Sequence, residues 1–244
     1  MISSQELTNL LKNAITLKLS FTMKQNMELV KPLVLDSSKQ GIWFTSDLHF
    51  GHANILKFCN RPWETTDEMN ADLIKNWNSV VKPDDLVFDL GDFAFASNSK
   101  WKDLLSQLNG HHYLILGNHD VTRWPGDKTM ELFEGVSHQM ILKIDGRTVY
   151  LNHYPYLCFG GAWRKPENAV YQLFGHVHSG PNCGGTDTDR LVNLFPYQYD
   201  VGVDNNNYTP VSWQQVQEVI NKQVEHGIEA QNKVHTIPDA AYKE

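Results

Sequence analysis

Residues 114–120 read LILGNHD, in which an apolar run stops at a glycine and is followed at once by asparagine, histidine and aspartate. Four more segments have the same form, an apolar strand and then polar residues: WFTSDLH (43–49), VFDLGD (87–92), VYLNHYP (149–155) and QLFGHVH (172–178). In layered α/β proteins, ligands bind beyond the carboxyl ends of the strands. The five segments therefore predict an α/β fold whose strand ends bring polar side chains together.

The polar residues in these segments are of the types that bind metal ions. In two segments they are spaced two residues apart, so an extended backbone would point each pair to one side of the chain. Glycine stands directly before Asp92, Asn118 and His176, where it permits a sharp turn and a close backbone approach. Seven nitrogen and oxygen ligands are too many for one tetrahedral zinc and suit two divalent cations that share a carboxylate. The candidate ligands are Asp47, His49, Asp92, Asn118, His153, His176 and His178.

The order of the segments is DxH, GD, GNHD, a single histidine and GHxH across residues 47–178. This order resembles the calcineurin-like metallophosphoesterase superfamily, in its small prokaryotic and phage branch. The resemblance implies a two-sheet β-sandwich flanked by helices, with four α-β-β-α layers. It also implies a binuclear centre in which the first cation is bound by Asp47, His49, Asp92 and His178, and the second by Asn118, His153, His176 and the bridging Asp92.

The resemblance also gives catalytic roles to two further residues of the GNHD segment. His119 matches the active-site histidine, which contacts the phosphate and can protonate the leaving oxygen, and Asp120 would orient its loop. The implied reaction is two-metal-dependent phosphoester hydrolysis, in which a hydroxide that bridges the cations attacks phosphorus. The family commonly uses manganese, so Mn²⁺ is the expected metal, with Fe, Zn, Co and Ni as alternatives for this mixed donor set.

Differences from the protein phosphatases of the superfamily narrow the expected substrate. Those enzymes read GDxxDRG, whereas Phe95 and Ala96 here occupy the positions of the aspartate that assists the histidine and of the phosphate-binding arginine. We therefore expect a phosphodiesterase that acts on a nucleotide, a cyclic nucleotide or a nucleic-acid end. The alternative is a phosphomonoesterase that acts on a small phosphorylated metabolite or nucleotide. A non-catalytic scaffold is disfavoured, because the ligand set and His119 are complete.

Four residues near these segments are candidates for substrate binding, and each has a second interpretation. His52 could approach the metals or the phosphate, or it could cap the helix that follows. Arg61 could clamp a phosphate, or it could lie on the surface. Arg164, within the run 163–165, could help to stack and clamp a nucleotide, or it could belong to an exposed turn. Arg123 has the same two interpretations.

The amino-acid composition limits which binding partners and which cellular compartment are expected. The 244 residues include 28 acidic and 21 basic side chains, a formal charge of −7. This charge disfavours a polymeric nucleic acid along a broad surface, while a short strand at the site remains a candidate. Three cysteines without a CxxC pair, the lack of a signal-peptide pattern and the lack of a long apolar run favour a cytoplasmic protein without a membrane span. The sequence does not indicate an oligomeric state.

One main domain is expected over 41–227, with an N-terminal helix and β-extension over 1–40 packed on it and a partly flexible tail over 228–244. The dipeptide Asp145–Gly146 predicts a tight hairpin. Apolar periodicity predicts helices at 4–16, 66–79, 99–108 and 212–226, and strands at 28–35, 41–46, 85–90, 112–116, 138–144, 147–152 and 169–174.

Overall fold

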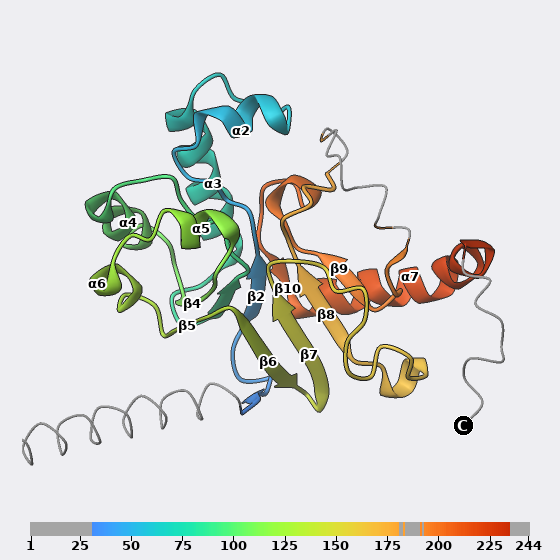
Figure 1. Cartoon of the computed structure of the whole chain (residues 1–244). Helices are drawn as coiled ribbons and strands as arrows, with labels where there is room; N and C mark the ends of the chain where they lie inside the picture. Colours follow the sequence, from blue (N-terminus) through green and yellow to red (C-terminus); the bar gives the residue numbers. More distant parts are fainter. Residues whose placement is uncertain (1–30, 181–182, 184–190, 192, 235–244) are drawn as a thin grey trace, which may run out of the picture.

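The computed structural model describes residues 31–180, 183, 191 and 193–234, which form two β-sheets with helices around them (Figure 1). The expected helix at 4–16 and residues 235–244 of the expected tail lie outside the described residues. The strands are β1 (Leu33–Leu35), β2 (Ile42–Thr45), β3 (Leu86–Asp89), β4 (His111–Ile115), β5 (Gly135–Ser137), β6 (Gln139–Ile144), β7 (Arg147–Asn152), β8 (Tyr171–Phe174), β9 (Gln198–Asp200) and β10 (Val211–Ser212). The α-helices are α2 (Ala53–Phe58), α3 (Thr66–Val80), α4 (Asn98–Leu105), α5 (Asn118–Thr122), α6 (Asp127–Met130) and α7 (Trp213–Val234).

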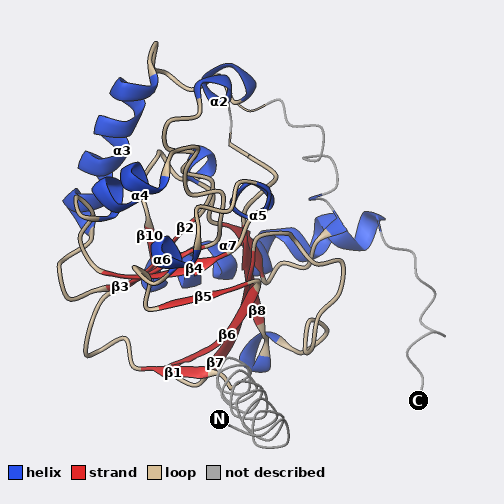
Figure 2. Cartoon of the chain, turned by 60° about the vertical axis from the view of Figure 1, so that its left-hand side comes forward, coloured by secondary structure: helices blue, strands red, loops and turns tan. Residues whose placement is uncertain are grey.

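The strands form two sheets of mixed direction. The β2 sheet has the order β10-β2-β3-β4-β5, in which β2 to β5 run parallel and β10 is antiparallel to β2. The β6 sheet has the order β1-β6-β7-β8-β9, in which β6 and β7 form the expected hairpin around Asp145–Gly146 and the other pairs are parallel. The sheets lie one over the other (Figure 2), which confirms the predicted α/β fold with a two-sheet sandwich.

The main core fills the space between the two sheets. Phe44 of β2 and Phe88 of β3 are fully buried and stack with their ring centroids 5.7 Å apart. Leu142 and Leu173 of the β6 sheet belong to the same cluster and are equally inaccessible. Alternate residues of a strand point to opposite faces, so this packing fixes the register of each strand and the point at which each strand ends.

Helix α3 covers the outer face of the β2 sheet. Met69, Leu73 and Trp77 recur at helical spacing and are buried against a second apolar cluster that includes Val87 of β3. The helix begins with a capping box, in which the Thr65 side chain and the Glu68 side chain each accept a backbone N–H of the other residue. The indole N–H of Trp77 donates to the Asn109 carbonyl at 2.9 Å, which ties the helix to the turn before β4.

Helix α7 closes one side of the sandwich. Trp213 contacts Phe44 of the β2 sheet and Tyr171 of the β6 sheet, with 6.4 and 5.9 Å between ring centroids. The helix continues to Val234, past the end that we expected near His226. The glycine that follows His226 costs only about 1 kcal/mol inside a helix, and the helix runs through it. Neither α7 nor any other helix of the described ranges combines the length and apolarity needed to cross a bilayer.

The sequence analysis missed several short elements. The missed strands β5, β9 and β10 have at most three residues, and the missed helices α2, α5 and α6 have at most six, which is too short for a helical period to emerge. The expected strand at 28–35 is represented, among the described residues, by β1 alone.

We predict that Trp77→Ala lowers the free energy of unfolding by about 3–5 kcal/mol, because it leaves a cavity between α3 and the β2 sheet and an unpaired carbonyl at Asn109. Urea unfolding followed by circular dichroism measures this loss. Trp163, whose side chain is 72% exposed, supplies the control, since Trp163→Ala should change stability by roughly 0.5 kcal/mol or less. Equal stabilities of the two variants would contradict the assignment of Trp77 to the core.

Candidate metal centre

The polar segments that follow five strands meet at one place in the fold. They come from the ends of β2, β3 and β4 in one sheet and of β7 and β8 in the other. The seven candidate ligands and His119 all lie in these segments, so both sheets contribute to the site. The arrangement fits the rule that ligands bind beyond the carboxyl ends of strands.

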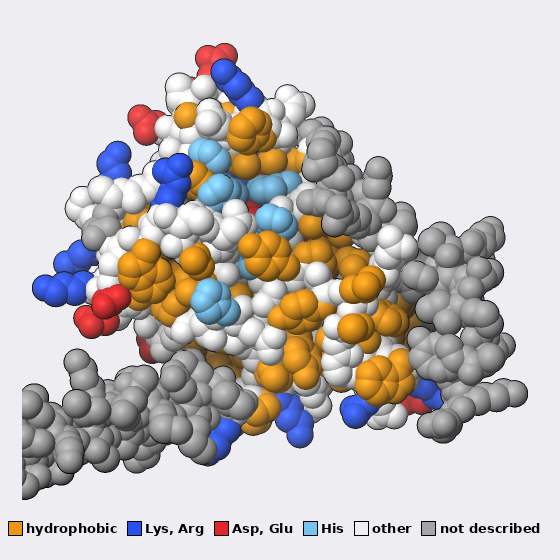
Figure 3. Space-filling model, viewed as in Figure 1, with side chains coloured by type: hydrophobic (Ala, Val, Ile, Leu, Met, Phe, Trp, Pro, Cys, Tyr) orange, Lys and Arg blue, Asp and Glu red, His pale blue; other side chains and the backbone are white. Residues whose placement is uncertain are grey.

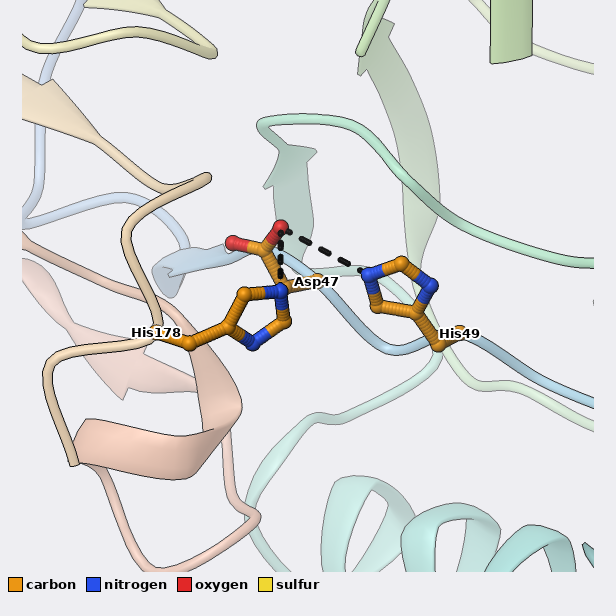
Figure 4. Close-up of side chains that lie close together, drawn as sticks. All are labelled: Asp47, His49 and His178. Carbon is orange, nitrogen blue, oxygen red and sulfur yellow. Dashed lines mark ion pairs between the residues drawn. The ribbon is translucent and has the colours of Figure 1, made fainter. Parts of the chain in front are cut away.

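The first group of ligand atoms belongs to Asp47, His49 and His178, whose side chains point toward one another (Figure 4). Asp47 Oδ1 lies 3.9 Å from His49 Nε2 and 3.8 Å from His178 Nε2. The three ligand atoms all lie within 4.8 Å of one another. One cation placed among them could contact all three.

The second group contains Asp47, Asp92 and His153, again with ligand atoms within 4.8 Å of one another. Asp92 Oδ2 lies 3.6 Å from His153 Nε2 and also 3.6 Å from His49 Nε2 of the first group. Asn118 Oδ1 lies 3.0 Å from His153 Nε2. Asp92 therefore stands between the two groups, where a bridging carboxylate would have to be.

His176 and His119 border the same groups. The His176 ring lies 5.1 Å from the His153 ring, and its backbone N–H donates to Asp47 Oδ2 at 2.8 Å. The His119 Nε2 atom lies 3.8 Å from Asp92 Oδ2, while its backbone N–H donates to Asp92 Oδ1 at 2.8 Å. The structure thus brings together all seven expected ligands and the expected catalytic histidine.

The backbone at these ligands differs from the extended conformation that the sequence analysis assumed. Five of the ligands have positive φ angles, a region that non-glycine residues seldom occupy. Each such residue costs roughly 1–3 kcal/mol, and such strain is concentrated at functional sites. Spacing by two residues still brings both members of each pair to the centre, but through left-handed turns. The residues are Asp47 (58°), His49 (53°), Asp92 (57°), His176 (70°) and His178 (47°).

Gly175 permits the closest approach between two of these segments. A Cβ atom at this position would collide with Ser46 Oγ and Asp47 Oδ2. The two side chains belong to the segment after β2, whereas Gly175 directly follows β8 in the other sheet. Glycine at this position therefore lets the two sheets meet at the centre.

The pKa values of the candidate ligands indicate a site that favours positive charge. Burial, with the neighbouring Asp47 adding to it, raises the pKa of Asp92 to about 8. Burial lowers the pKa of His178, but Asp47 and Asp204 outweigh it and bring that pKa to about 11. Burial also holds the pKa of His49 well below its usual value, which leaves the neutral imidazole that binds metals. The Asp92 carboxyl thus retains a proton where a cation could neutralise it instead.

Two buried polar atoms support the same interpretation. Asp47 Oδ1 and His49 Nε2 are inaccessible to solvent and have no hydrogen-bond partner. A buried polar atom without a partner costs free energy, and in native proteins it usually has an explanation. Both atoms face each other in the first group, and a divalent cation between them would satisfy both. The nitrogen and oxygen donors present therefore fit metal ions.

Asp120 has a different environment from that expected of a catalytic residue. It is 1% exposed and accepts hydrogen bonds from the backbone N–H groups of Asp92, Phe93 and Gly117 at 2.7–3.1 Å. These bonds join the segment after β3 to the segment after β4. Asp120 therefore positions the two loops, and its carboxylate is not available to substrate.

Arg61 corrects both of the interpretations that the sequence left open. It is 4% exposed, so it neither lies on the surface nor reaches a phosphate. Its guanidinium binds both carboxylate oxygens of Asp204 at 2.8 and 2.9 Å. The remaining N–H groups donate to the carbonyls of Leu48 and Asp47 and to the Met69 sulfur, so all five donors are in use.

Asp204 is the residue that the sequence analysis missed. Besides binding Arg61, its Oδ2 atom lies 2.7 Å from His178 Nδ1. A carboxylate can only accept, so the proton stands on Nδ1 and the Nε2 atom of His178 faces Asp47. A carboxylate behind a metal-binding histidine fixes the orientation of its ring in this way. No strand-end pattern marks it in the sequence, because Asp204 stands four residues after β9, in the 3₁₀ turn Val203–Asn205.

The other candidates for substrate binding divide into two kinds. A metal cavity of about 390 Å³ opens over the ligands, and both His52 and Arg123 line it. His52 is the N-cap of α2 without a capping side-chain bond; its Nδ1 lies 3.1 Å from that of His49. Arg164 instead lies in an exposed turn, and no contact joins it to the centre in the described part of the chain.

Phe95 holds three of the groups around this cavity. Its ring stacks on His52 with 3.6 Å between centroids and an interplanar angle of 6°. The His119 ring lies 4.6 Å away, and the Arg123 guanidinium lies 4.4 Å from the ring centroid. An aromatic face therefore replaces the hydrogen-bonding carboxylate that the protein phosphatases use beside the histidine.

A third group of ligand-type atoms comprises Cys59, Cys183 and Asp204. Asp204 already uses both oxygens to bind Arg61 and His178. The Cys183 thiol donates to the Cys59 carbonyl at 3.5 Å, and burial raises its pKa further above neutrality. We therefore assign no metal ion to this group.

Comparison with known proteins places these features in a family. A model of the calcineurin-like phosphoesterases matches residues 41–204, which include every candidate ligand and His119. The chain is 35% identical to an uncharacterized protein of Methanocaldococcus jannaschii over 191 residues, covering 76% of this chain and 94% of that protein. It is 30% identical to the Gene 66 protein of Mycobacterium phage D29 over 209 residues, covering 77% and 98%. A solved structure of a protein of unknown function from Aquifex aeolicus has a TM-score of 0.56 at 25% identity, over 74% of this chain and 99% of that one.

We predict that Asp204→Asn weakens Mn²⁺ binding about 10- to 100-fold, because His178 loses the charged group that orients its ring. Calorimetric titration of the metal-free protein with Mn²⁺ measures this change. Asp72→Asn is the control, since Asp72 is an exposed carboxylate on α3 that accepts a hydrogen bond from the Trp63 indole, away from the metal centre. Equal affinities of Asp204→Asn and the unchanged protein would exclude this role for Asp204.

Proposed function

The chain belongs to the calcineurin-like phosphoesterases, which hydrolyse phosphoesters with the help of metal ions, and we propose that its own substrate is a phosphodiester. The observation that carries this proposal is the scarcity of cationic side chains around the metal cavity. Among the described residues, Arg123 is the one arginine or lysine that lines this cavity. Arg61 is buried and bound to Asp204, so it does not face the cavity. A diester carries one negative charge and a monoester up to two. One guanidinium beside two cations therefore suits the diester.

The proposal assigns the seven ligands to two divalent cations, with Asp92 shared between them. Such cations polarise a phosphoester and lower the pKa of a bound water toward neutrality. We propose Mn²⁺ as the resident ion, because a mixed set of carboxylate, amide and imidazole donors accepts it. Asp47 and Asp92 contribute the charges that balance the cations, and the neutral imidazoles contribute the nitrogen donors.

His119 is the proposed general acid. Its side chain is 36% exposed at the cavity, and its backbone N–H is held by Asp92. Burial and the nearby Arg123 lower the pKa of His119, so its protonated ring gives up a proton more readily than free imidazole does. In this position His119 would protonate the leaving oxygen, and Arg123 would stabilise the phosphate charge.

A comparison of two chromogenic esters tests the phosphodiester proposal. With purified protein and Mn²⁺, we expect a higher kcat/KM for bis-p-nitrophenyl phosphate than for p-nitrophenyl phosphate, because the described walls of the cavity offer no cationic side chain besides Arg123 for the second charge of a dianion. Metal analysis of the same sample would give the number of bound ions and separate Mn from Fe, Zn, Co and Ni. A higher kcat/KM for the monoester would instead support a phosphomonoesterase that acts on a phosphorylated metabolite or nucleotide.

We predict that His119→Ala lowers kcat on an ester with a poor leaving group by roughly 10²–10⁴-fold, the range for a lost general acid, while the metal content stays unchanged. The loss should be smaller on a p-nitrophenyl ester, whose leaving group needs no proton. His138→Ala is the matched control, since His138 is an exposed histidine that does not line the cavity. Equal losses on both esters would contradict the acid role.

A further inference from the structure

A second cavity adjoins the metal cavity and has a different chemistry. Its volume is about 430 Å³, and it shares the walls His176 and Val177 with the metal cavity. Its other walls include Tyr154, Leu157, Leu194 and Asn193, and no charged side chain lines it within the described residues. The structure therefore places a mainly apolar space directly beside the phosphate-binding centre.

Large apolar side chains are exposed at this second cavity. Leu157 is 74% exposed, although leucine usually packs inside, and Tyr154 is 43% exposed. Figure 3 shows several histidines grouped on one face of the molecule with hydrophobic side chains beside them. Exposed apolar surface next to a polar site is typical of a ligand-binding groove.

Tyr154 couples this second cavity to the metal centre. Its ring lies 4.6 Å from the His176 ring and 5.0 Å from the His153 ring, both in edge-to-face contacts. These contacts hold the aromatic side chain at the border between the centre and the apolar space. A flat group bound to the phosphate could stack against this ring.

We propose that the second cavity binds the nucleobase of the group that remains on phosphorus, so that the enzyme selects nucleotide diesters by their retained nucleoside. The inference rests on the proposed phosphodiesterase function and names its substrate class. A nucleobase is planar and largely apolar on its faces, which suits Tyr154 and the leucines, and its polar edge suits the Asn193 amide. A charged occupant would find no counter-charge on the described walls.

The position of His119 decides which ester group enters the second cavity. His119 lines the metal cavity together with Phe95 and Arg123 but does not line the second cavity. A leaving oxygen has to face the proton donor, so the leaving group lies on the His119 side. The group on the Tyr154 side is therefore the one that stays on phosphorus, and the product of the reaction is a nucleoside monophosphate.

Two esters with the same leaving group test this assignment. Thymidine 5′-(p-nitrophenyl phosphate) and methyl p-nitrophenyl phosphate both release p-nitrophenolate and differ only in the retained group. We expect kcat/KM to be at least tenfold higher for the thymidine ester, because base stacking on an aromatic side chain contributes a factor of that size. Equal values for the two esters would overturn the inference and leave the phosphodiester proposal standing. Failure to hydrolyse either ester would overturn both.

Variants locate the preference on the second cavity. Tyr154→Ala should reduce the ratio of the two kcat/KM values about tenfold, and Tyr154→Phe should preserve it, since the ring rather than the hydroxyl stacks. Leu157→Ala should reduce the ratio less. Leu157 makes no ring contact with His153 or His176, so this variant probes the cavity without disturbing those two histidines. Trp163→Ala removes an exposed aromatic outside the cavity and should leave the ratio unchanged. An unchanged ratio in both Tyr154→Ala and Leu157→Ala would contradict the assignment.

Direct binding provides a readout that does not depend on turnover. In the presence of Mn²⁺, calorimetry should give tighter binding for thymidine 5′-monophosphate than for inorganic phosphate, and Tyr154→Ala should remove most of that difference. Equal binding of the two compounds by the unchanged protein would overturn the inference, because both carry the phosphate and only one carries the base.

Discussion

The structure depends on how buried carboxylates are held at the junction of the two sheets. Asp47, Asp92, Asp120 and Asp204 are each at most 6% exposed. A buried carboxylate without partners is costly, so each oxygen needs a donor or a cation. Asp120 binds three backbone N–H groups, and Asp204 binds an arginine and a histidine. These bonds join loops that are far apart in sequence and fix the cavity floor.

In each of the other two carboxylates, Asp47 and Asp92, one oxygen accepts a backbone hydrogen bond and the other faces the imidazoles. Asp47 and Asp92 each accept a backbone N–H with one oxygen, from His176 and His119 respectively. Their other oxygens, Asp47 Oδ1 and Asp92 Oδ2, face the imidazoles of the centre. The backbones of Asp47, Asp92 and His176 all adopt strained left-handed conformations at these contacts. The scaffold therefore uses half of each carboxylate for its own geometry and leaves the other half for cations, which links the strain of the loops to the capacity to bind metal.

The sequence was sufficient to predict which candidate ligands lie together, but not which groups stand behind them. The ligands follow apolar strands, a local pattern, and their order along the chain matches a known arrangement. Arg61 has no such pattern, because its partner Asp204 is 143 residues away and its burial depends on how α2 and α3 pack. Asp120 was expected to orient the loop of His119, but its place in the sequence did not reveal that it also binds the backbone of Asp92 and Phe93 in the segment after β3. Local spacing also could not reveal left-handed backbone, which arises from contacts between segments such as that of Gly175 with Asp47.

The replacement of a carboxylate by Phe95 links the histidine to the charge of the cavity. A carboxylate beside His119 would hold the ring by a hydrogen bond and would raise its pKa. The Phe95 ring holds His119 and His52 by packing and adds no negative charge, while Arg123 lies over the same ring. Burial, together with Arg123, lowers the pKa of His119, and the Arg123 guanidinium remains free of an internal carboxylate partner among the described residues. The cavity therefore presents one unengaged guanidinium and one imidazole held by an aromatic face, an arrangement that fits the proposed singly charged ester.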